Sequence, residues 1–220
     1  MTGKAGVSPG PEAWPIPLAL SDAEAIRGTT RTGAPIPEGY ADMVDRVRVL
    51  LERVASTAPP AAMVDDVTKL VEEINARLLP YGVDEADQLS GQLIAFPGRA
   101  QLLVPPYDVD ELDDRRAVGR VRFGRHHLGS NGAVHGGAIP QLFDDLLGRL
   151  ALVGGRRRSR TAYLHVDYRS IAPIGEELGL EAWFEREEGR KRYLRGVLRH
   201  GARVCAEVEG LFVVLRPGQP

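Results

Sequence analysis

The C-terminal part of the chain contains four segments in which polar and apolar residues alternate, and only short connections separate them. These segments are residues 161–169, 178–186, 191–200 and 203–215. Alternation with a period of two is typical of half-buried strands. Gly189 and Gly201 lie in connections that are too short for a crossover helix and are predicted to form hairpin turns. Strands joined in this way run antiparallel, which excludes a doubly wound parallel sheet.

A single long helix is predicted just before these strands. The apolar residues that recur there every three or four positions are Ile139, Leu142, Phe143, Leu146, Leu147 and Leu150. Gly154 and Gly155 follow as a C-cap signal, so we expect a helix over residues 137–153. Residues 117–123 are predicted to form one more strand. This order of elements predicts an α+β fold in which one helix packs on an antiparallel sheet.

The N-terminal half is organised differently. Residues 1–39 are rich in Pro and Gly and are predicted to form an extended arm. Two amphipathic helices are expected next, over residues 41–57 and 63–78, separated by Pro59 and Pro60. Neither helix can bury its apolar stripe alone, so we expect them to pack on each other and on the rest of the protein. The predicted domains are an arm (1–39), a helical extension (40–95), an α+β domain (96–216) and a tail (217–220).

The composition excludes several classes of protein. The formal net charge is −2, which argues against a general nucleic-acid binder. We find no run of about 18 apolar residues and no secretory signal, so we expect a cytoplasmic protein without a membrane span. Cys205 is the only cysteine, which excludes an internal disulfide framework and a cysteine zinc cage. The five histidines are scattered, so no metal site is expected.

The residues most suggestive of chemistry lie at the start of the predicted helix, in the segment from Asn131 to Asp145. Gly136 and Gly137 lead directly into the helix, so its first backbone N–H groups are open to close approach by a ligand atom. Pro140 is tolerated in a first helical turn and damaging beyond it, so the helix must start near these glycines. A helix N-terminus is partially positive and suits an oxygen that becomes negative during a reaction.

Two acidic residues, Asp144 and Asp145, follow two turns further along this helix. Helix geometry places them about 130° and about 120° from the centre of the apolar stripe, on opposite sides. One carboxylate could therefore face a partner surface while the other faces solvent. A helix that starts at glycines and carries two solvated aspartates accounts for the same residues without any function. Both interpretations stay open on these grounds alone.

The spacing His-Gly-Gly-x6-Asp, from His135 to Asp144, resembles the signature of hotdog-fold acyl-CoA thioesterases of the phenylacetate-pathway type and of their thioesterase-superfamily relatives. Further matching segments are residues 161–170, 188–191 and 206–213. The resemblance covers residues 115–216 in the order expected of that family. It implies an α+β hotdog fold over residues 96–216, in which an antiparallel sheet wraps around one long helix, preceded by an α-helical N-terminal extension.

The resemblance also implies catalytic roles. Asp144 would be the catalytic carboxylate, either as general base toward water or as nucleophile toward the thioester carbonyl. The backbone N–H of Gly137, with that of Gly136 beside it, would hold the carbonyl oxygen. His135 would orient the thioester or the loop. Thr161 would lie across a dimer interface and help to position the water.

The chain departs from the family at one position. Several relatives have Asn or Gln six residues before the histidine, where this chain has Gly129, and the nearest amide side chain is that of Asn131. Either Asn131 substitutes through a loop shift, or the backbone alone polarises the carbonyl. Asp145 does not match the family spacing and is expected to be a bystander.

Coenzyme A carries phosphates, and the resemblance implies basic residues near them. Arg169, Arg190 and Lys191 match positions that the family uses near the nucleotide, and guanidinium groups suit phosphate geometry. Asp167 and Ser170 occupy neighbouring strand positions and would contact pantetheine or adenine. Runs of basic residues are also common on solvated surfaces, and that interpretation stays open beside this one.

The resulting prediction is an enzyme of lipid metabolism that hydrolyses an acyl-CoA thioester to a free carboxylic acid and CoA. It implies no metal or redox cofactor, because CoA enters as part of the substrate. The family builds its active site from two subunits, so a homodimer or a dimer of dimers is expected. We hypothesise that residues 40–80 cover a sheet face or the acyl tunnel.

Two other functions stay open. The hotdog domain could be a non-catalytic module that binds acyl-CoA or a partner protein, with residues 40–80 as docking helices. Nucleic-acid binding through the arginine runs would require salt-dependent affinity for any duplex, and it is the least favoured function.

Overall fold

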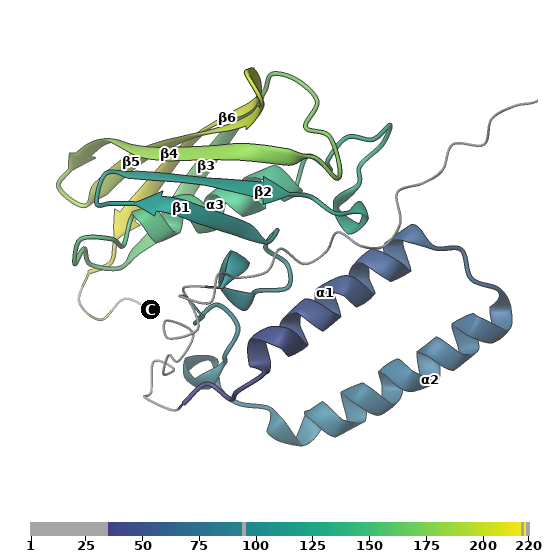
Figure 1. Ribbon diagram of the computed structural model, residues 1–220. Helices are drawn as coiled ribbons and strands as arrows, with labels where there is room; N and C mark the ends of the chain where they lie inside the picture. The colour runs from purple at the N-terminus through teal and green to yellow at the C-terminus, as the bar shows by residue number, and fades with distance from the viewer. Residues whose placement is uncertain (1–34, 94–95, 217, 219–220) are drawn as a thin grey trace, which may run out of the picture.

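The computed structural model describes residues 35–93, 96–216 and 218, and its centre is a six-stranded antiparallel sheet with helix α3 (Ala138–Leu150) against one face (Figure 1). The strands are β1 (Tyr107–Leu112), β2 (Arg116–Arg122), β3 (Ser159–Tyr168), β4 (Glu177–Glu188), β5 (Lys191–His200) and β6 (Arg203–Val214). Their order in the sheet is β1-β2-β4-β5-β6-β3. The predicted α+β architecture is therefore confirmed. Residues 1–34 of the predicted arm, and all of the predicted tail except Gly218, lie outside the described residues.

Both hairpin turns form where the glycines predict them. Glu188 pairs with Lys191 across the first turn, and His200 pairs with Arg203 across the second. Gly189 and Gly201 have φ angles of 59° and 57°, in the left-handed region that favours glycine. The five predicted strands differ from the observed ones by at most two residues at either end.

The core lies between helix α3 and the sheet. All six residues of the predicted apolar stripe are buried there, and Phe143 and Leu147 are fully enclosed. The helix ends at Leu150, three residues earlier than predicted. Gly154 and Gly155 then have φ angles of 75° and 72°, so both contribute to the turn that leads to β3.

Strand β1 was not predicted from the sequence. Its acidic residues, Asp108, Asp110 and Glu111, obscure the alternation of polar and apolar residues, because an edge strand can leave such side chains in water. Gly119 of β2 makes this pairing possible, since a Cβ atom there would lie 2.1 Å from the backbone oxygen of Asp108.

Strand β3 forms the opposite edge of the sheet, with β6 as its single strand neighbour among the described residues. All ten of its residues are half-buried or exposed. Tyr163 and Tyr168 on this strand expose 40% and 54% of their surface. A long edge strand of this kind leaves backbone N–H and C=O groups available to pair with another strand.

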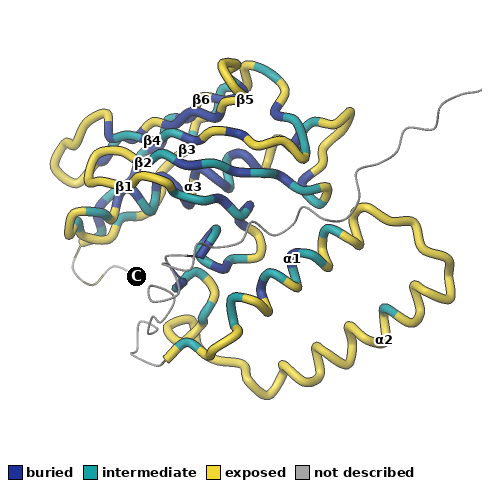
Figure 2. Tube along the Cα trace, in the orientation of Figure 1, coloured by how far each residue is buried: buried dark blue, intermediate teal, exposed yellow. Residues whose placement is uncertain are grey.

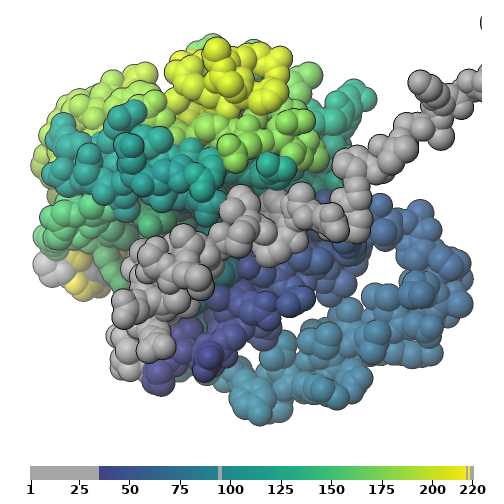
Figure 3. Space-filling view, viewed as in Figure 1, coloured from purple at the N-terminus to yellow at the C-terminus, as the bar shows by residue number. Residues whose placement is uncertain are grey.

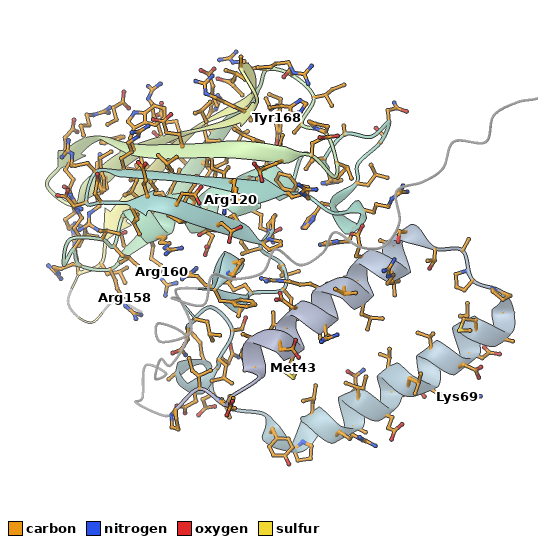
Figure 4. The ribbon with its side chains drawn as sticks, in the orientation of Figure 1. Met43, Lys69, Arg120, Arg158, Arg160 and Tyr168 are labelled. Carbon is orange, nitrogen blue, oxygen red and sulfur yellow. The ribbon has the colours of Figure 1, made fainter. Side chains whose placement is uncertain are left out.

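The two N-terminal helices, α1 (Tyr40–Ser56) and α2 (Ala61–Leu78), do not pack as expected. Helix α2 is exposed along its whole length except for the half-buried Val67, and open space separates it from α1 (Figures 2 and 3). Met43 of α1 points toward this space (Figure 4). The expectations that the two stripes cover each other, and that α2 covers a sheet face, are therefore wrong for the described residues.

Helix α1 contacts the rest of the protein through its other side. Val44 packs with Leu93, Phe96 and Ala100 in a second small core, separate from the main one. The contact with the main domain thus consists of the segment before β1 and of polar side chains of α1. Val44 is the buried residue of the apolar stripe, whereas Met43, Leu50, Leu51 and Val54 stay exposed. Of the helices within the described ranges, none has the length and apolar character needed to cross a bilayer.

Candidate active site

The N-terminus of helix α3 is open, as its glycines predict. Gly137 is the N-cap residue and, as a glycine, has no side chain that could accept a hydrogen bond from the first helical N–H groups. Gly136 and Gly137 are both exposed, and the helix begins directly after them at Ala138. Pro140 is in the first turn, where its missing N–H group leaves no hydrogen bond unmade.

The peptide that joins Gly136 and Gly137 is held at both ends. The Tyr168 hydroxyl donates a hydrogen bond of 2.6 Å to the Gly136 carbonyl oxygen. The Gly137 N–H donates one of 3.0 Å to Nδ1 of His135. In this state His135 therefore occupies the N–H group that the resemblance assigns to the substrate oxygen. The imidazole must turn away before the Gly137 N–H can bind a ligand.

Asp144 lies on the exposed flank of α3 and contacts β3. The Thr161 hydroxyl donates a hydrogen bond of 2.8 Å to Oδ1 of Asp144. The resemblance implied that Thr161 reaches the site across a dimer interface, and the structure instead joins the two residues within one chain. A carboxylate with one oxygen held by a hydroxyl and the other accessible can accept a proton from water or attack an electrophile.

Asp145 lies on the opposite flank and is buried, so it is no solvated bystander. Both Arg99 and the Tyr107 hydroxyl donate hydrogen bonds to its carboxylate, the latter at 2.6 Å. Burial, followed by the neighbouring Asp145 carboxylate, raises the pKa of Tyr107 well above its usual value. The two adjacent aspartates are thus held by different parts of the chain, Asp144 by β3 and Asp145 by the segment that leads into β1.

One chain does not bring the helix N-terminus and Asp144 together. Asp144 is seven positions after Gly137, which corresponds to about 10 Å along the helix axis. A carbonyl group must lie about 3 Å from both its N–H donors and an attacking group. Direct attack by Asp144 on a carbonyl held by Gly137 of the same chain is therefore excluded by distance.

Asn131 occupies a tight turn before α3. Its φ angle is 51° and that of Gly132 is 74°, and the turn closes through a 2.9 Å hydrogen bond from Ala133 N to Ser130 O. At the position where relatives have an amide, a Cβ on Gly129 would lie 3.1 Å from Cα of His135. The backbone is thus too close there for a longer side chain unless the loop moves.

The residues assigned to coenzyme A fall into two separate groups. Arg169 forms ion pairs with Glu207 at 2.6 Å and with Asp167 at 3.1 Å, beside a hollow of about 290 Å³ on the sheet face away from α3. The Ser170 hydroxyl donates to the carbonyl oxygen of Val204 at 2.6 Å. These residues lie at the end of β3.

Arg190 and Lys191 lie at the other end of the sheet. Lys191 pairs with Val213, whereas Asp167 pairs with Glu207, six residues earlier on β6. The separation is about 20 Å along the strand. Arg160 and Tyr168, which are labelled in Figure 4, mark the two ends of β3. No single chain brings both groups to one nucleotide.

The loop that carries the glycines also contacts helix α1. The Glu52 carboxylate of α1 accepts hydrogen bonds from the backbone N–H and Nδ1 of His126, at 3.3 and 2.9 Å. His127 is buried beside it, and its backbone oxygen accepts a 2.7 Å hydrogen bond from the N–H of His135. Among the described residues, Nδ1 of His127 has no hydrogen-bond partner.

Stability should fall in mild acid because of His127. Burial, followed by the charge of His126, lowers the pKa of His127 to about 4. Between pH 6.5 and 4 the unfolded chain binds a proton there and the folded chain does not, so the free energy of unfolding should decrease by about 3 kcal/mol as the pH falls through this window. Chemical denaturation at several pH values measures this. His127→Phe should reduce the pH dependence of the free energy of unfolding. His165→Gln, at an exposed histidine, should leave it unchanged. Equal slopes in the parent protein and both variants would contradict the assignment to His127.

Four residues of this region, Tyr168, Arg99, Tyr107 and Arg48, were not predicted from the sequence. Tyr168 contacts Gly136, and Arg99 and Tyr107 contact Asp145, each across a long stretch of chain. Arg48 contacts the loop that carries Arg99. One signal was present for Arg48, because it lies four residues after Val44 on the buried side of an amphipathic helix. The others had no sequence signal, since their partners are 32 or more residues away.

An antiparallel sheet packed on one central helix, with an open glycine N-terminus and an acidic residue further along, defines a hotdog fold. Residues 131–207 match the model of the Thioesterase superfamily. The chain therefore has the hotdog fold, and these residues are similar to the thioesterase superfamily.

Individual proteins show the same similarity. Acyl-coenzyme A thioesterase THEM4 of Mus musculus is 28% identical over 109 residues, which are 49% of this chain and 46% of that protein. The Rattus norvegicus protein of the same name matches equally well in identity and coverage. The chain thus matches about half the length of these curated relatives. The crystal structure of RHA08564, a thioesterase superfamily protein, has a TM-score of 0.69 at 27% identity, covering 85% of this chain and 96% of that one.

Proposed function

We propose that this protein hydrolyses an acyl-CoA thioester to a carboxylic acid and CoA. The observation that carries the proposal is the hydrogen bond from Thr161 to Asp144, which holds an exposed carboxylate on a helix that starts at two exposed glycines. The similarity of residues 131–207 to the thioesterase superfamily and the activity named for the THEM4 relatives support the same reaction.

The chemistry follows from these groups. Asp144 accepts a proton from water as the water oxygen adds to the thioester carbonyl carbon, and helix N–H groups stabilise the negative charge on the carbonyl oxygen. When the tetrahedral intermediate collapses, the C–S bond breaks and the CoA sulfur leaves with the electron pair. Thr161 keeps one oxygen of Asp144 fixed, so that the other faces the water. In the alternative route Asp144 attacks the carbonyl itself and water then hydrolyses the anhydride.

We also propose that two chains build each active site, by antiparallel pairing of their β3 edges. Thr161 near the start of β3 holds Asp144, and Tyr168 at its end holds the Gly136 carbonyl. Antiparallel pairing brings the start of one strand beside the end of the other. This arrangement would place the glycines of one chain near Asp144 of the other. It would also bring the end of the sheet that carries Arg190 in one chain near Arg169 of the other chain.

A panel of acyl-CoA substrates with a free-thiol reagent tests the reaction. We expect thiol release above background for at least one acyl class. Absence of release across the panel, with Asp144→Ala indistinguishable from the parent protein, would leave the non-catalytic binding module as the better description. The exposed apolar residues of α2 are the observation that favours such a module.

Mixing two inactive variants tests the shared site. Gly137→Pro removes the N–H group at a position whose φ of −70° suits proline, and Asp144→Asn removes the carboxylate. In mixed dimers one of the two sites then carries neither change, so co-refolding equal amounts should restore about a quarter of the parent activity. If each site belonged to a single chain, mixing would restore nothing. Size-exclusion chromatography of each variant checks that both still assemble.

A further inference from the structure

The buried carboxylate of Asp145 connects the helix of the proposed active site to the N-terminal part of the chain. Arg99 donates to both of its oxygens through Nε and Nη2, and the Tyr107 hydroxyl donates to one of them. The side chain of Asp145 is 4% exposed and that of Arg99 is 26% exposed. Arg149 is a further positively charged group near Tyr107.

Arg99 reaches Asp145 from a loop with an unusual backbone. Gly98, Arg99 and Ala100 have φ angles of 58°, 53° and 62°, so three successive residues are in the left-handed region. Residues other than glycine adopt this conformation only where their surroundings hold them in it. The loop therefore needs an anchor on its other side.

Arg48 of helix α1 is that anchor. Its side chain is 3% exposed, and Nη2 donates hydrogen bonds to the carbonyl oxygens of Pro97 at 2.8 Å and Gln101 at 3.0 Å, at the two ends of the loop. The guanidinium carbon lies 5.3 Å from the centre of the Phe96 ring. Helix α1 thus clamps the loop, and the loop presents Arg99 to Asp145.

We propose that Arg99 and Asp145 are positioning residues for the active site, and that Arg48 acts through them. The proposal rests on the proposed function. Consecutive residues of an α-helix point about 100° apart, so a contact on Asp145 fixes the rotation of α3 that Asp144 needs to meet Thr161. Helix α1 would then support the active site, because its Arg48 holds the loop from which Arg99 contacts Asp145.

The energetics favour positioning over stability as the role of this pair. A buried ion pair gains little net stability, because removing two charges from water offsets most of their attraction. What such a pair does supply is a directional constraint, since a guanidinium binds a carboxylate in one plane. A rotation that moves Asp144 by about 1 Å can reduce turnover by up to about a hundredfold.

A double-mutant cycle on kcat tests the proposal. Arg99→Gln and Asp145→Asn should each lower kcat about tenfold with little change in KM, and the double variant should be no slower than either one. Arg99→Lys, which keeps the charge and loses the planar fork, should recover part of the loss. Arg46→Gln on the exposed side of α1 is the matched control and should behave as the parent protein. Additive losses, or losses only in melting temperature, would overturn the proposal.

Two further measurements separate this proposal from the proposed function. In an Asp144→Asn background, Arg99→Gln should slow the residual reaction no further, because the group that it positions is gone. Crystal structures of the parent and Arg99→Gln proteins need no turnover: the distance from Thr161 Oγ1 to Asp144 Oδ1, 2.8 Å here, should exceed 3.5 Å in the variant. A parent protein without thioesterase activity would refute the proposed function, whereas an unchanged distance would refute the positioning role.

Discussion

Replacing Asp144 with Asn should lower kcat for acyl-CoA hydrolysis by about a thousandfold and leave KM nearly unchanged. The amide has the same shape and can still accept the hydrogen bond from Thr161, so the local structure should persist. It can neither take a proton from water nor attack a carbonyl, and the loss of a general base typically reduces rates by about 10² to 10⁴. Steady-state thiol release over a range of substrate concentrations separates kcat from KM.

Thr161→Val provides the graded control for this experiment. It leaves the carboxylate in place and removes one hydrogen bond to a charged group, which is worth about 1.5–3 kcal/mol when made. We expect a loss in kcat of about tenfold to a hundredfold, between the parent protein and Asp144→Asn. An Asp144→Asn protein as active as the parent would show that the reaction uses another group.

The substitution Gly196→Ala should lower the free energy of unfolding by about 3 kcal/mol, at the upper end of what one extra buried methyl group usually causes. Gly196 lies on β5 directly beneath Phe143 of α3. A Cβ atom there would be 2.5 and 2.7 Å from two atoms of the Phe143 ring and 3.3 Å from the Glu181 carbonyl oxygen. Phe143 is fully buried and has no room to move aside. Urea denaturation followed by circular dichroism measures the effect.

Two companion variants make this result specific. Gly179 is on the neighbouring strand β4, with nothing within 4 Å of a built Cβ, so Gly179→Ala should change stability by less than about 0.5 kcal/mol. Phe143→Leu creates space below β5 and should restore part of the stability in the Gly196→Ala background. If the double variant is less stable than Gly196→Ala alone, the clash with Phe143 is not the cause.

The same substitution connects the core to the proposed chemistry. The Phe143 ring packs directly on Gly196, and this contact sets the distance between α3 and the sheet. Phe143 immediately precedes Asp144 in the chain. Partial displacement of the helix would move Asp144 away from Thr161 as well as reducing stability. A decrease in kcat larger than the unfolded fraction of the protein can explain would reveal this displacement.

Local pattern was sufficient to predict the elements that depend on neighbours in the chain. Two-residue hairpin turns require a residue with positive φ, and Gly189 and Gly201 adopt this conformation at no steric cost. The stripe of α3 and its glycine start are equally local, since a period of 3.6 residues identifies the buried face. The roles assigned to Asp144 and the other site residues came from a family resemblance, and the geometry near Thr161 is compatible with them.

The sequence by itself therefore determined an antiparallel sheet on one helix, an open helix N-terminus and an acidic residue on each flank. Only the tertiary structure decided that Asp145 is buried against Arg99 and that α2 stays uncovered. The physical reason is that hydrophobic periodicity predicts which face of a helix or strand is buried. It carries no information about which residue, distant along the chain, packs against that face. Arg99 lies 46 residues before Asp145, and only the folded chain brings a guanidinium to that carboxylate.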